Sequence, residues 1–483
     1  MNTVVTIFGN TLPANILQKA MHAQQKALGE YGDDKRFVFH YTPEHHPVLE
    51  ELGGRMLVPS SEPFSYTEVA KPLLLGCIPN STQSYRAAIA ICSAARALGY
   101  MGLWFDLGAY PGSGAKRRFA DRNAHIRKTA EKAQQSELYQ SLYYEKFYAK
   151  KERSIEKNYI DQALSELLVP FYMDFDKRTP IVATHAFAAQ SAVHAHMEHV
   201  VNALPGNCAF ATHLAEGSIH VAQTPSSYLS YKMLRGMGGN HVMQSIPEYE
   251  IAYGGHFVDH LMIQHLERDC DKRIARAKGS MPLRWLVSLD ELCLRKEFLL
   301  PLFDKLTTLE KEGRAVLVIN IGNHKELWEE LKKENSYLRM WGLEYPDNYT
   351  DIKNYSNDLR TKKGLTGIHV FSSTDEIINI YTTNLLMRGC DILLCRACEL
   401  SFYPIPKLIA RREGREDFWG GMHCSEMGEA TFECFSNAQL LQMIDVLDKE
   451  RDTFISMCKC IQKSQSIGLY SGAYEAVRLA TEN

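Results

Sequence analysis

Apolar and polar positions follow two regular patterns along this chain. Short apolar runs predict buried strands, and between them lie longer stretches whose apolar positions recur at helical spacing. In the first half, strands are predicted over residues 4–8, 37–41, 73–78, 103–107, 180–184, 208–212 and 220–224, with helices over 14–28, 85–98 and from the strand at 180–184 to about residue 200. Strands that alternate with helices in this way are typical of parallel sheets.

The second half repeats the pattern. Strands are predicted over residues 284–288, 315–319, 368–371, 392–395 and 407–410, and helices over 258–277, 325–332, 374–387, 437–447 and 471–480, with a further helix that ends at 309. A glycine-rich stretch without helical periodicity ends at Gly254 and Gly255. The sequence therefore predicts an α/β protein with two Rossmann-like domains, an N-terminal one over 1–253 and a C-terminal one over 254–483.

Residues 112–168 differ from the rest of the first half. They are polar, mostly helix-forming and weakly apolar, which predicts a helical excursion from the N-terminal domain. Basic residues gather in its first part: Lys116, Arg117, Arg118, Arg122, Arg127 and Lys128. Two interpretations stay open, a solvated helical surface and a basic rim that faces phosphates or acidic lipid headgroups.

Composition narrows the class of protein. The 483 residues carry a formal net charge of -3, so no overall basic field exists to hold nucleic acid. No apolar run approaches the roughly 20 residues of a membrane helix, and the first residues lack the pattern of a signal peptide. The 12 cysteines suit buried thiols in a reducing compartment, so we expect a cytoplasmic protein. Cys395 and Cys398 have no second ligand pair at zinc spacing, so we expect no metal.

Ligands of open parallel sheets bind beyond the carboxyl ends of the strands. His185 comes directly after the strand predicted at 180–184, so we expect its side chain to point toward such a site. A histidine with a pKa near neutrality can accept a proton from an acceptor hydroxyl. The alternative is a histidine that is hydrogen-bonded inside the N-terminal domain and has no catalytic role.

Several phrases of the chain resemble the GT-B glycosyltransferases, particularly the branch of MurG-type enzymes and monogalactosyldiacylglycerol synthases. The phrase from Cys390 and Asp391 into the apolar run at 392–394 is similar to that family's small-Asp-apolar-apolar segment, and Gly414-Arg415-Glu416 is similar to its last loop. Residues 182–187 are similar to the branch's Thr-His-Pro-Phe segment, and 253–258 resemble its interdomain segment.

This resemblance implies two Rossmann-like domains that face across a cleft, and transfer of a sugar from a nucleotide-diphosphate sugar to an acceptor. It places the nucleotide on the C-terminal domain, with no further cofactor. The residues that we expect at the nucleotide are Glu399, Ser401, Arg411, Arg415 and Glu416. For the arginines, a solvated loop is the alternative. Arginine suits bidentate contact with phosphate, and His185 would be the base on the N-terminal side.

The chain departs from the family where glycines normally approach the diphosphate. Residues 397–401 replace the glycine-rich donor loop, residues 288–291 replace the Gly-Gly loop of the second domain, and residues 79–82 replace the N-terminal glycine loop. Without glycine, the backbone approaches a diphosphate less easily. Two alternatives therefore stay open: a non-catalytic GT-B-like binding or regulatory protein, and a sugar-nucleotide epimerase on the same fold.

Overall fold

A computed structural model of the protein describes residues 5–66, 69–79, 81–239, 241–292, 295–362, 364–412 and 414–482. It divides the chain into two units, each with its own sheet. Unit 1 contains Met1–Glu131, Ser141–His260 and Ser471–Asn483, and unit 2 contains Lys132–Gln140 and Leu261–Tyr470. The chain thus passes into unit 2 after His260, beyond the boundary predicted at 253, and its last helix belongs to unit 1.

Unit 1 is built on an eight-stranded sheet in the order β10-β9-β8-β7-β5-β6-β4-β3. Its strands are β3 (His40–Glu44), β4 (Gly54–Ser60), β5 (Pro72–Cys77), β6 (Met101–Asp106), β7 (Ile181–Ala183), β8 (Val200–Ala203), β9 (Ile219–Ala222) and β10 (Ile251–Tyr253). All neighbours are parallel except β3 and β4. The chain adds β6 on one side of β5 and β7 on the other, so the strand order reverses between β5 and β7.

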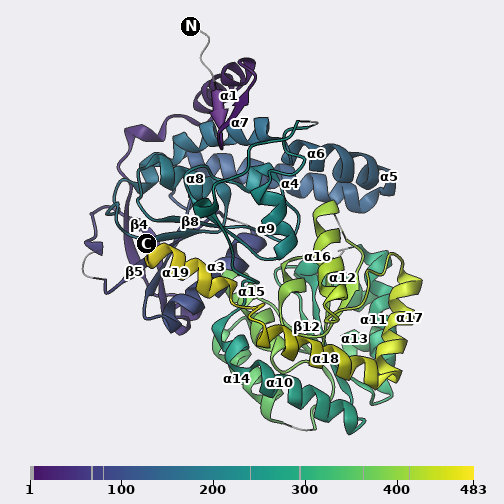
Figure 1. Ribbon diagram of the computed structural model, residues 1–483. Coiled ribbons are helices and arrows are strands. Elements are labelled where there is room, and N and C mark those ends of the chain that lie inside the picture. Colours follow the sequence, from purple (N-terminus) through teal and green to yellow (C-terminus); the bar gives the residue numbers. More distant parts are fainter. Residues whose placement is uncertain are drawn as a thin grey trace. The chain divides into compact units, whose positions relative to one another are not determined.

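The helices of unit 1 are α1 (Asn15–Tyr31), α2 (Pro47–Glu51), α3 (Thr82–Ala97), α4 (Gly114–Gln135), α6 (Ala149–Glu152), α7 (Ile155–Ser165), α8 (Ala186–His194), α9 (Pro225–Lys232) and α19 (Gly472–Thr481). The end of α4 and the whole of α5 (Glu137–Tyr139) lie in the short segment of unit 2. The C-terminal helix α19, yellow in Figure 1, lies against α3 and also contacts β7, β8 and β9. The apolar strand β5 is buried between these layers, which explains its continuous run of leucines.

Three predictions for unit 1 need correction. The first predicted strand is β1 (Val5–Ile7), which pairs only with β2 (Asn10–Leu12), outside the main sheet. The helix predicted to run to about residue 200 ends at His194, and Val200–Ala203 is a strand. The turn between them uses His196 at φ +59°, so no glycine or proline marks it in the sequence. Residues 208–212, predicted as a strand, lead instead into a 3-10 turn, Ala211–His213.

Unit 2 has a six-stranded sheet in which all strands are parallel, in the order β13-β14-β12-β11-β15-β16. The strands are β11 (Leu283–Ser288), β12 (Ala315–Asn320), β13 (Gly342–Glu344), β14 (Ile368–Phe371), β15 (Ile392–Arg396) and β16 (Lys407–Ala410). Here the order reverses between β11 and β15. Both units are thus Rossmann-like, as predicted, with parallel strands connected by helices.

The helices of unit 2 are α10 (His260–Lys278), α11 (Lys296–Lys311), α12 (Lys325–Glu334), α13 (Ser336–Trp341), α14 (Tyr349–Thr361), α15 (Glu376–Met387), α16 (Arg415–Glu426), α17 (Asn437–Lys449) and α18 (Arg451–Ser466). The sequence did not predict four of them, α13, α14, α16 and α18. Helix α16 replaces the loop expected around Arg415. A Cβ at Gly421 would lie 2.9 Å from the Cβ of Ala397, so glycine here serves close helix packing. Among the described residues, no helix is long and apolar enough to cross a membrane.

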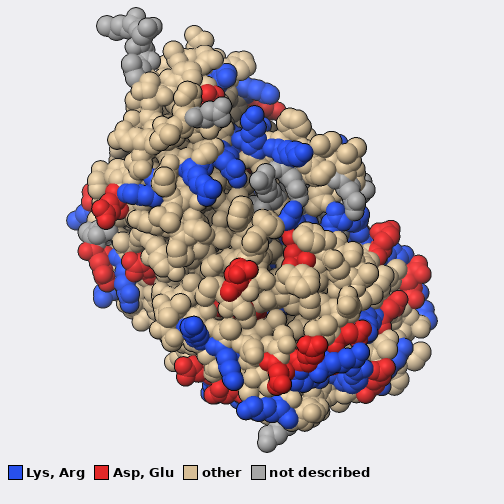
Figure 2. All heavy atoms as spheres, turned by 45° about the vertical axis from the view of Figure 1, so that its right-hand side comes forward, with Lys and Arg blue, Asp and Glu red and all other residues tan. Residues whose placement is uncertain are grey.

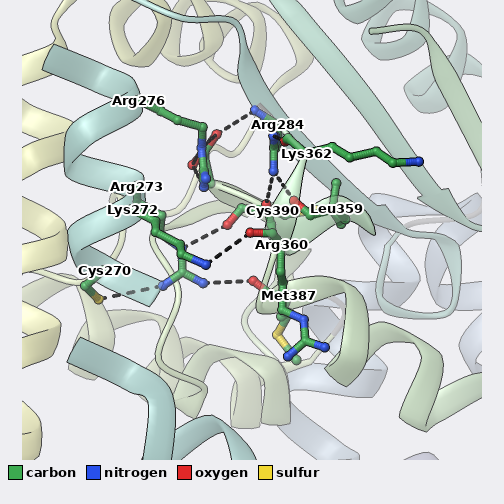
Figure 3. Close-up of polar contacts among 12 residues, drawn as sticks. Cys270, Lys272, Arg273, Arg276, Arg284, Leu359, Arg360, Lys362, Met387 and Cys390 are labelled. Carbon is green, nitrogen blue, oxygen red and sulfur yellow. Dashed lines mark hydrogen bonds and ion pairs between the residues drawn. The ribbon is translucent and has the colours of Figure 1, made fainter. Parts of the chain in front are cut away.

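Arginine side chains stabilise the edge of the unit 2 sheet at which its strands begin (Figure 3). Arg276 Nε donates to Asp391 Oδ1 at 2.9 Å, and Asp391 Oδ2 accepts from the backbone N–H of Arg284 at 2.9 Å. Arg284 Nη2 donates to the carbonyl of Lys362 at 2.8 Å, just beyond the end of α14. Asp391, part of the family-like phrase, therefore has a structural role at the edge of the sheet opposite to the ligand-binding one.

His220 links pH to the stability of unit 1. It is fully buried, its Nδ1–H donates to the carbonyl of Glu250 at 2.9 Å, and its Nε2 accepts from the N–H of Ala215 at 3.1 Å. Burial lowers its pKa to about 4, because the charged ring would lose its hydration. A second ring proton would also face the N–H of Ala215. The unfolded chain binds this proton near pH 6.5, so stability is complete above that pH and falls as the pH drops toward 4.

We expect His220 to contribute about 3 kcal/mol to this loss of stability, from a pKa difference of roughly 2.5. Urea denaturation between pH 7.5 and 4 measures it. A His220→Gln variant should lose its share of the slope, whereas His22→Ala, at an exposed position, should keep it. An unchanged slope in the His220 variant would contradict the assignment.

Candidate functional site

Each sheet offers one place where its topology favours a ligand. In open parallel sheets this is the crevice beyond the carboxyl ends of the two strands at which the order reverses. These strands are β5 and β7 in unit 1, and β11 and β15 in unit 2. We describe the two places separately.

In unit 1, hydrogen bonds join the start of α3 to the end of β7. The hydroxyls of Ser84 and Thr184 lie 2.7 Å apart, and the Ser84 hydroxyl also accepts from the N–H of Ile78 at 3.4 Å. Ser81 caps α3 by accepting from the N–H of Ser84. Ser81 thus serves helix capping, and Asn80 lies outside the described residues.

His185 follows β7 and caps helix α8. Its Nδ1 accepts from the backbone N–H of Phe187 at 3.0 Å, and the side chain is half-buried. Burial, and next to it the charge of Arg122, hold the pKa of His185 well below its usual range, so the ring is neutral at pH 7. With Nδ1 as the acceptor, the single ring proton lies on Nε2. His185 therefore presents a donor, and the predicted role as a base would require this proton to move to Nδ1.

Arg122 of α4 points at the same ring nitrogen. Its Nη1 and Nη2 each lie 3.5 Å from His185 Nε2, and its guanidinium lies over the Phe187 ring at 5.2 Å. A guanidinium has donors and no acceptor, so an Nε2–H and the Nη groups face one another as donors. The place between them suits an acceptor atom that neither side chain supplies.

The structure divides the basic residues of the helical excursion into two sets. Arg118 and Arg122 are half-buried against unit 1, and Arg118 also lies over the Phe187 ring at 5.2 Å. The other basic residues are exposed, namely Lys116, Arg117, Arg127 and Lys128. On the face drawn in Figure 2, Lys and Arg side chains gather over unit 1, whereas acidic and basic side chains are mixed over unit 2.

In unit 2, an aspartate and a histidine meet where β11 and β12 end. His324 Nε2 lies 2.7 Å from Asp290 Oδ1, and Asn379 of α15 donates from Nδ2 to Asp290 Oδ2. Asp290 follows β11, and His324 follows β12 and precedes α12. A Cβ at Gly322, which has φ +57°, would collide with the Asp290 carboxylate, so glycine permits the two loops to approach.

This pair fixes the same tautomer for His324 as for His185, with the proton on Nε2, but here Nδ1 is the nitrogen that stays available. A carboxylate only accepts, so in the neutral ring the proton lies on Nε2 and the lone pair on Nδ1. Within the described part of the chain, His324 Nδ1 has no hydrogen-bond partner, and the ring is about a quarter exposed. A carboxylate that orients an imidazole in this way prepares it to accept a proton.

The sequence analysis did not predict the Asp290–His324 pair. The available signal was positional, because Asp290 and His324 each follow a predicted strand, and the ends of parallel strands meet at one edge of a sheet. What the sequence lacked was the knowledge that β11 and β12 are neighbours.

The predicted nucleotide residues Glu399 and Ser401 lie in a 3-10 turn, η8 (Glu399–Phe402), directly after β15. Ser401 is fully buried, and its hydroxyl donates to the carbonyl of Cys398. Glu399 is half-buried at the start of this turn. The structure thus brings both residues to the end of β15, with the Ser401 hydroxyl turned into the protein.

The predicted arginines follow β16. Arg411 Nη2 donates to Gln140 Oε1 at 3.0 Å, and Arg412 forms an ion pair with Glu433 at 3.2 Å. Arg415 and Glu416 begin α16, and their side chains lie outside the described residues. Arg411 and Arg412 are thus held by neutral or acidic neighbours of unit 2.

Cys395 and Cys398 follow the C-x-x-C pattern at the same strand end. Burial, and next to it the neighbouring Cys395, raise the pKa of the Cys398 thiol well above its usual range. Such thiols are protonated at neutral pH and are poor metal ligands. In the described ranges, no three His, Cys, Asp or Glu side chains are grouped so as to hold a metal ion.

Two family models match this chain, each over one part of it. Residues 6–233 match the family model described as Domain of unknown function (DUF6937), and residues 246–481 match the model described as Domain of unknown function (DUF6938). The two ranges are separated by the glycine-rich stretch before β10. A search of curated proteins found no match.

Several solved structures are similar over most of their length. They include a trehalose 6-phosphate synthase from Burkholderia multivorans (11% identity, 85% of this chain and 97% of that one, TM-score 0.43) and a UDP-GlcNAc 2-epimerase from Neisseria meningitidis bound to UDP-GlcNAc (12%, 86% and 100%, 0.43). The spinosyn rhamnosyltransferase SpnG, complexed with thymidine diphosphate, is a third (11%, 86% and 100%, 0.40). At these TM-scores the likeness carries no argument about the ligand of this chain.

Proposed function

We propose that this protein transfers a sugar from a nucleotide-diphosphate sugar to the hydroxyl group of an acceptor. The observation that carries the proposal is the Asp290–His324 pair at the strand ends of unit 2. Rossmann-like sheets bind nucleotides at this edge, and transfer to a hydroxyl requires a base.

In this transfer one bond forms at the sugar, one bond breaks, and one proton moves to the protein. The acceptor oxygen attacks the anomeric carbon of the sugar, the bond from that carbon to the diphosphate oxygen breaks, and the hydroxyl proton passes to His324 Nδ1. Asp290 stabilises the imidazolium that forms. Asn379 holds the other carboxylate oxygen, which keeps Asp290 in place.

The residues that the sequence assigned to the nucleotide keep this role in the proposal. Glu399 would bind the ribose, and Arg411, Arg415 and Glu416 would contact the nucleotide, with Ser401 shaping the turn. His185 is the rival base, provided that its proton moves to Nδ1. The same imidazole chemistry also suits an epimerase, which removes a proton from a carbon atom of the sugar.

A binding or regulatory protein without turnover is the second candidate, and three contacts favour it. The Ser401 hydroxyl, Arg411 and Arg412 are engaged with protein atoms. Residues that are already satisfied gain less from a phosphate ligand than free ones do. This candidate keeps nucleotide binding and predicts no product.

Thermal unfolding with UDP, GDP, dTDP and their sugars tests the proposal. A ligand at 100 times its Kd should stabilise the fold by about 2.7 kcal/mol and raise the Tm, and release of free nucleoside diphosphate should follow when an acceptor is present. Free sugars without phosphate serve as controls. Stabilisation without product would favour the binding protein, an isomerised sugar would favour the epimerase, and no shift with any nucleotide would refute all three.

A further inference from the structure

We infer that unit 1 contains a phosphate-binding site between Arg122 and His185, at the reversal between β5 and β7. The inference deepens the proposed function, because it assigns the phosphates of the same substrate to unit 1, whereas the sequence assigned them to unit 2. The ligand class is a phosphate or diphosphate group of a small molecule.

Two hydrogen-bond donors face each other at this site. His185 Nδ1 accepts from the N–H of Phe187, which leaves a proton on Nε2, and both Nη groups of Arg122 lie 3.5 Å from that nitrogen. Donor groups that face one another repel unless an acceptor lies between them. A phosphate oxygen can accept from the ring N–H and the guanidinium at once.

Positive charge predominates around Arg122 and His185. Among the described residues, no carboxylate forms an ion pair with Arg122, although it is half-buried. Lys157 and His213 are near enough to His185 to lower its pKa further. The first-turn N–H groups of α8 add partial positive charge at the same strand end. The surroundings of His185 thus favour an anion.

The side chains of this site are held by contacts with the Phe187 ring. The rings of His185 and Phe187 are stacked, with centroids 5.6 Å apart and planes 4° from parallel. The same Phe187 ring lies beneath the guanidinium groups of Arg118 and Arg122. Arg118 is further fixed because its Nη1 donates to the carbonyl of Leu164 at 3.2 Å. The donors are therefore held in place before a ligand arrives, which lowers the entropy cost of binding.

Unit 2 carries charges of both signs at its own reversal, because β15 ends at Arg396. The residues that follow β11 and β15 include the carboxylates Asp290, Glu291 and Glu399. Carboxylates repel a diphosphate, and this end of the sheet instead carries the Asp290–His324 pair.

Isothermal titration of the full chain with pyrophosphate and with UDP tests the site. Arg122→Met removes the charge and keeps the length of the side chain, and His185→Asn keeps an N-cap acceptor while it removes the ring N–H. Each should weaken binding of pyrophosphate and UDP by about 10- to 100-fold. Arg127→Met, at an exposed position on the same helix, should bind as the wild type does.

Several outcomes would overturn the inference. They are a folded Arg122→Met variant with unchanged affinity, an equal loss in Arg127→Met, and binding to acidic phospholipid vesicles with none to pyrophosphate. Binding of UDP without any binding of pyrophosphate or effect of Arg122→Met would return the phosphates to unit 2. Should Arg122→Met not fold, Arg122→Lys keeps the test, because it retains the charge and loses the forked geometry.

Failure of this site is distinguishable from failure of the proposed function. Pyrophosphate affinity requires no turnover, so wild-type binding that Arg122→Met abolishes supports the site even if no product forms. Conversely, turnover that is unaffected by Arg122→Met refutes the site and leaves glycosyl transfer intact.

Discussion

Replacing Arg273 by methionine is expected to lower the free energy of unfolding of unit 2 by about 3–5 kcal/mol. Arg273 is fully buried in α10, and Figure 3 shows its guanidinium directed at the chain that follows α15. Its Nε donates to the carbonyl of Cys390 at 2.9 Å, and its Nη2 donates to the carbonyl of Met387 at 2.8 Å. Methionine fills much of the volume, but it leaves these buried carbonyls without donors.

Urea denaturation followed by tryptophan fluorescence measures this loss. Arg268→Met is the matched control, because Arg268 lies on the same helix and is exposed. It should change the free energy of unfolding by less than about 0.5 kcal/mol. A loss below about 1 kcal/mol in the Arg273 variant would mean that water replaces the guanidinium, contrary to our expectation.

Replacing His324 by alanine is expected to lower kcat for glycosyl transfer by about 10²–10⁴-fold, with little change in the affinity for the nucleotide. The reason is that Nδ1 would no longer accept the proton of the acceptor hydroxyl, while the phosphates bind elsewhere. Asp290→Asn should also lower kcat, because an amide can donate to His324 Nε2 and reverse the tautomer. Both effects are measured as the rate of release of nucleoside diphosphate at saturating donor.

The histidine variants separate the two candidate bases. His22→Ala, at an exposed position in α1, should leave kcat unchanged. His185→Asn should mainly raise the KM for the donor, because we assign its ring N–H to phosphate. If His185→Asn lowers kcat and His324→Ala does not, the base lies in unit 1, as the strand-end position of His185 predicted from the sequence.

Local sequence was sufficient for most of the buried framework. The strands predicted at 368–371 and 407–410 have these bounds in the structure, and those at 284–288, 315–319 and 392–395 differ by one residue at one end. The physical reason is that parallel strands covered on both faces are continuous apolar runs. The same reason made the α/β class and the two Rossmann-like sheets predictable.

Elements with mixed polarity were not predictable in this way. The edge strands β10 and β13 were missed, as were helices α14 and α18. An edge strand pairs with only one neighbouring strand, and its run of apolar residues is short. Helix α14 has few apolar positions, whereas α18 does bury an apolar face that the sequence analysis did not use. Their conformation depends on packing against residues far away in the sequence.

The sequence by itself determined most of the buried strands, the fold class and the presence of polar residues after strand ends, including His185. Only the tertiary structure decided what each polar group contacts. Arg122 meets His185 and Asp290 meets His324 across tens of residues of chain. Which ring nitrogen of a histidine holds the proton follows from these contacts. Because the hydrogen-bond partners decide which ring nitrogen stays available, a donor and a base look the same in the sequence and differ in the fold.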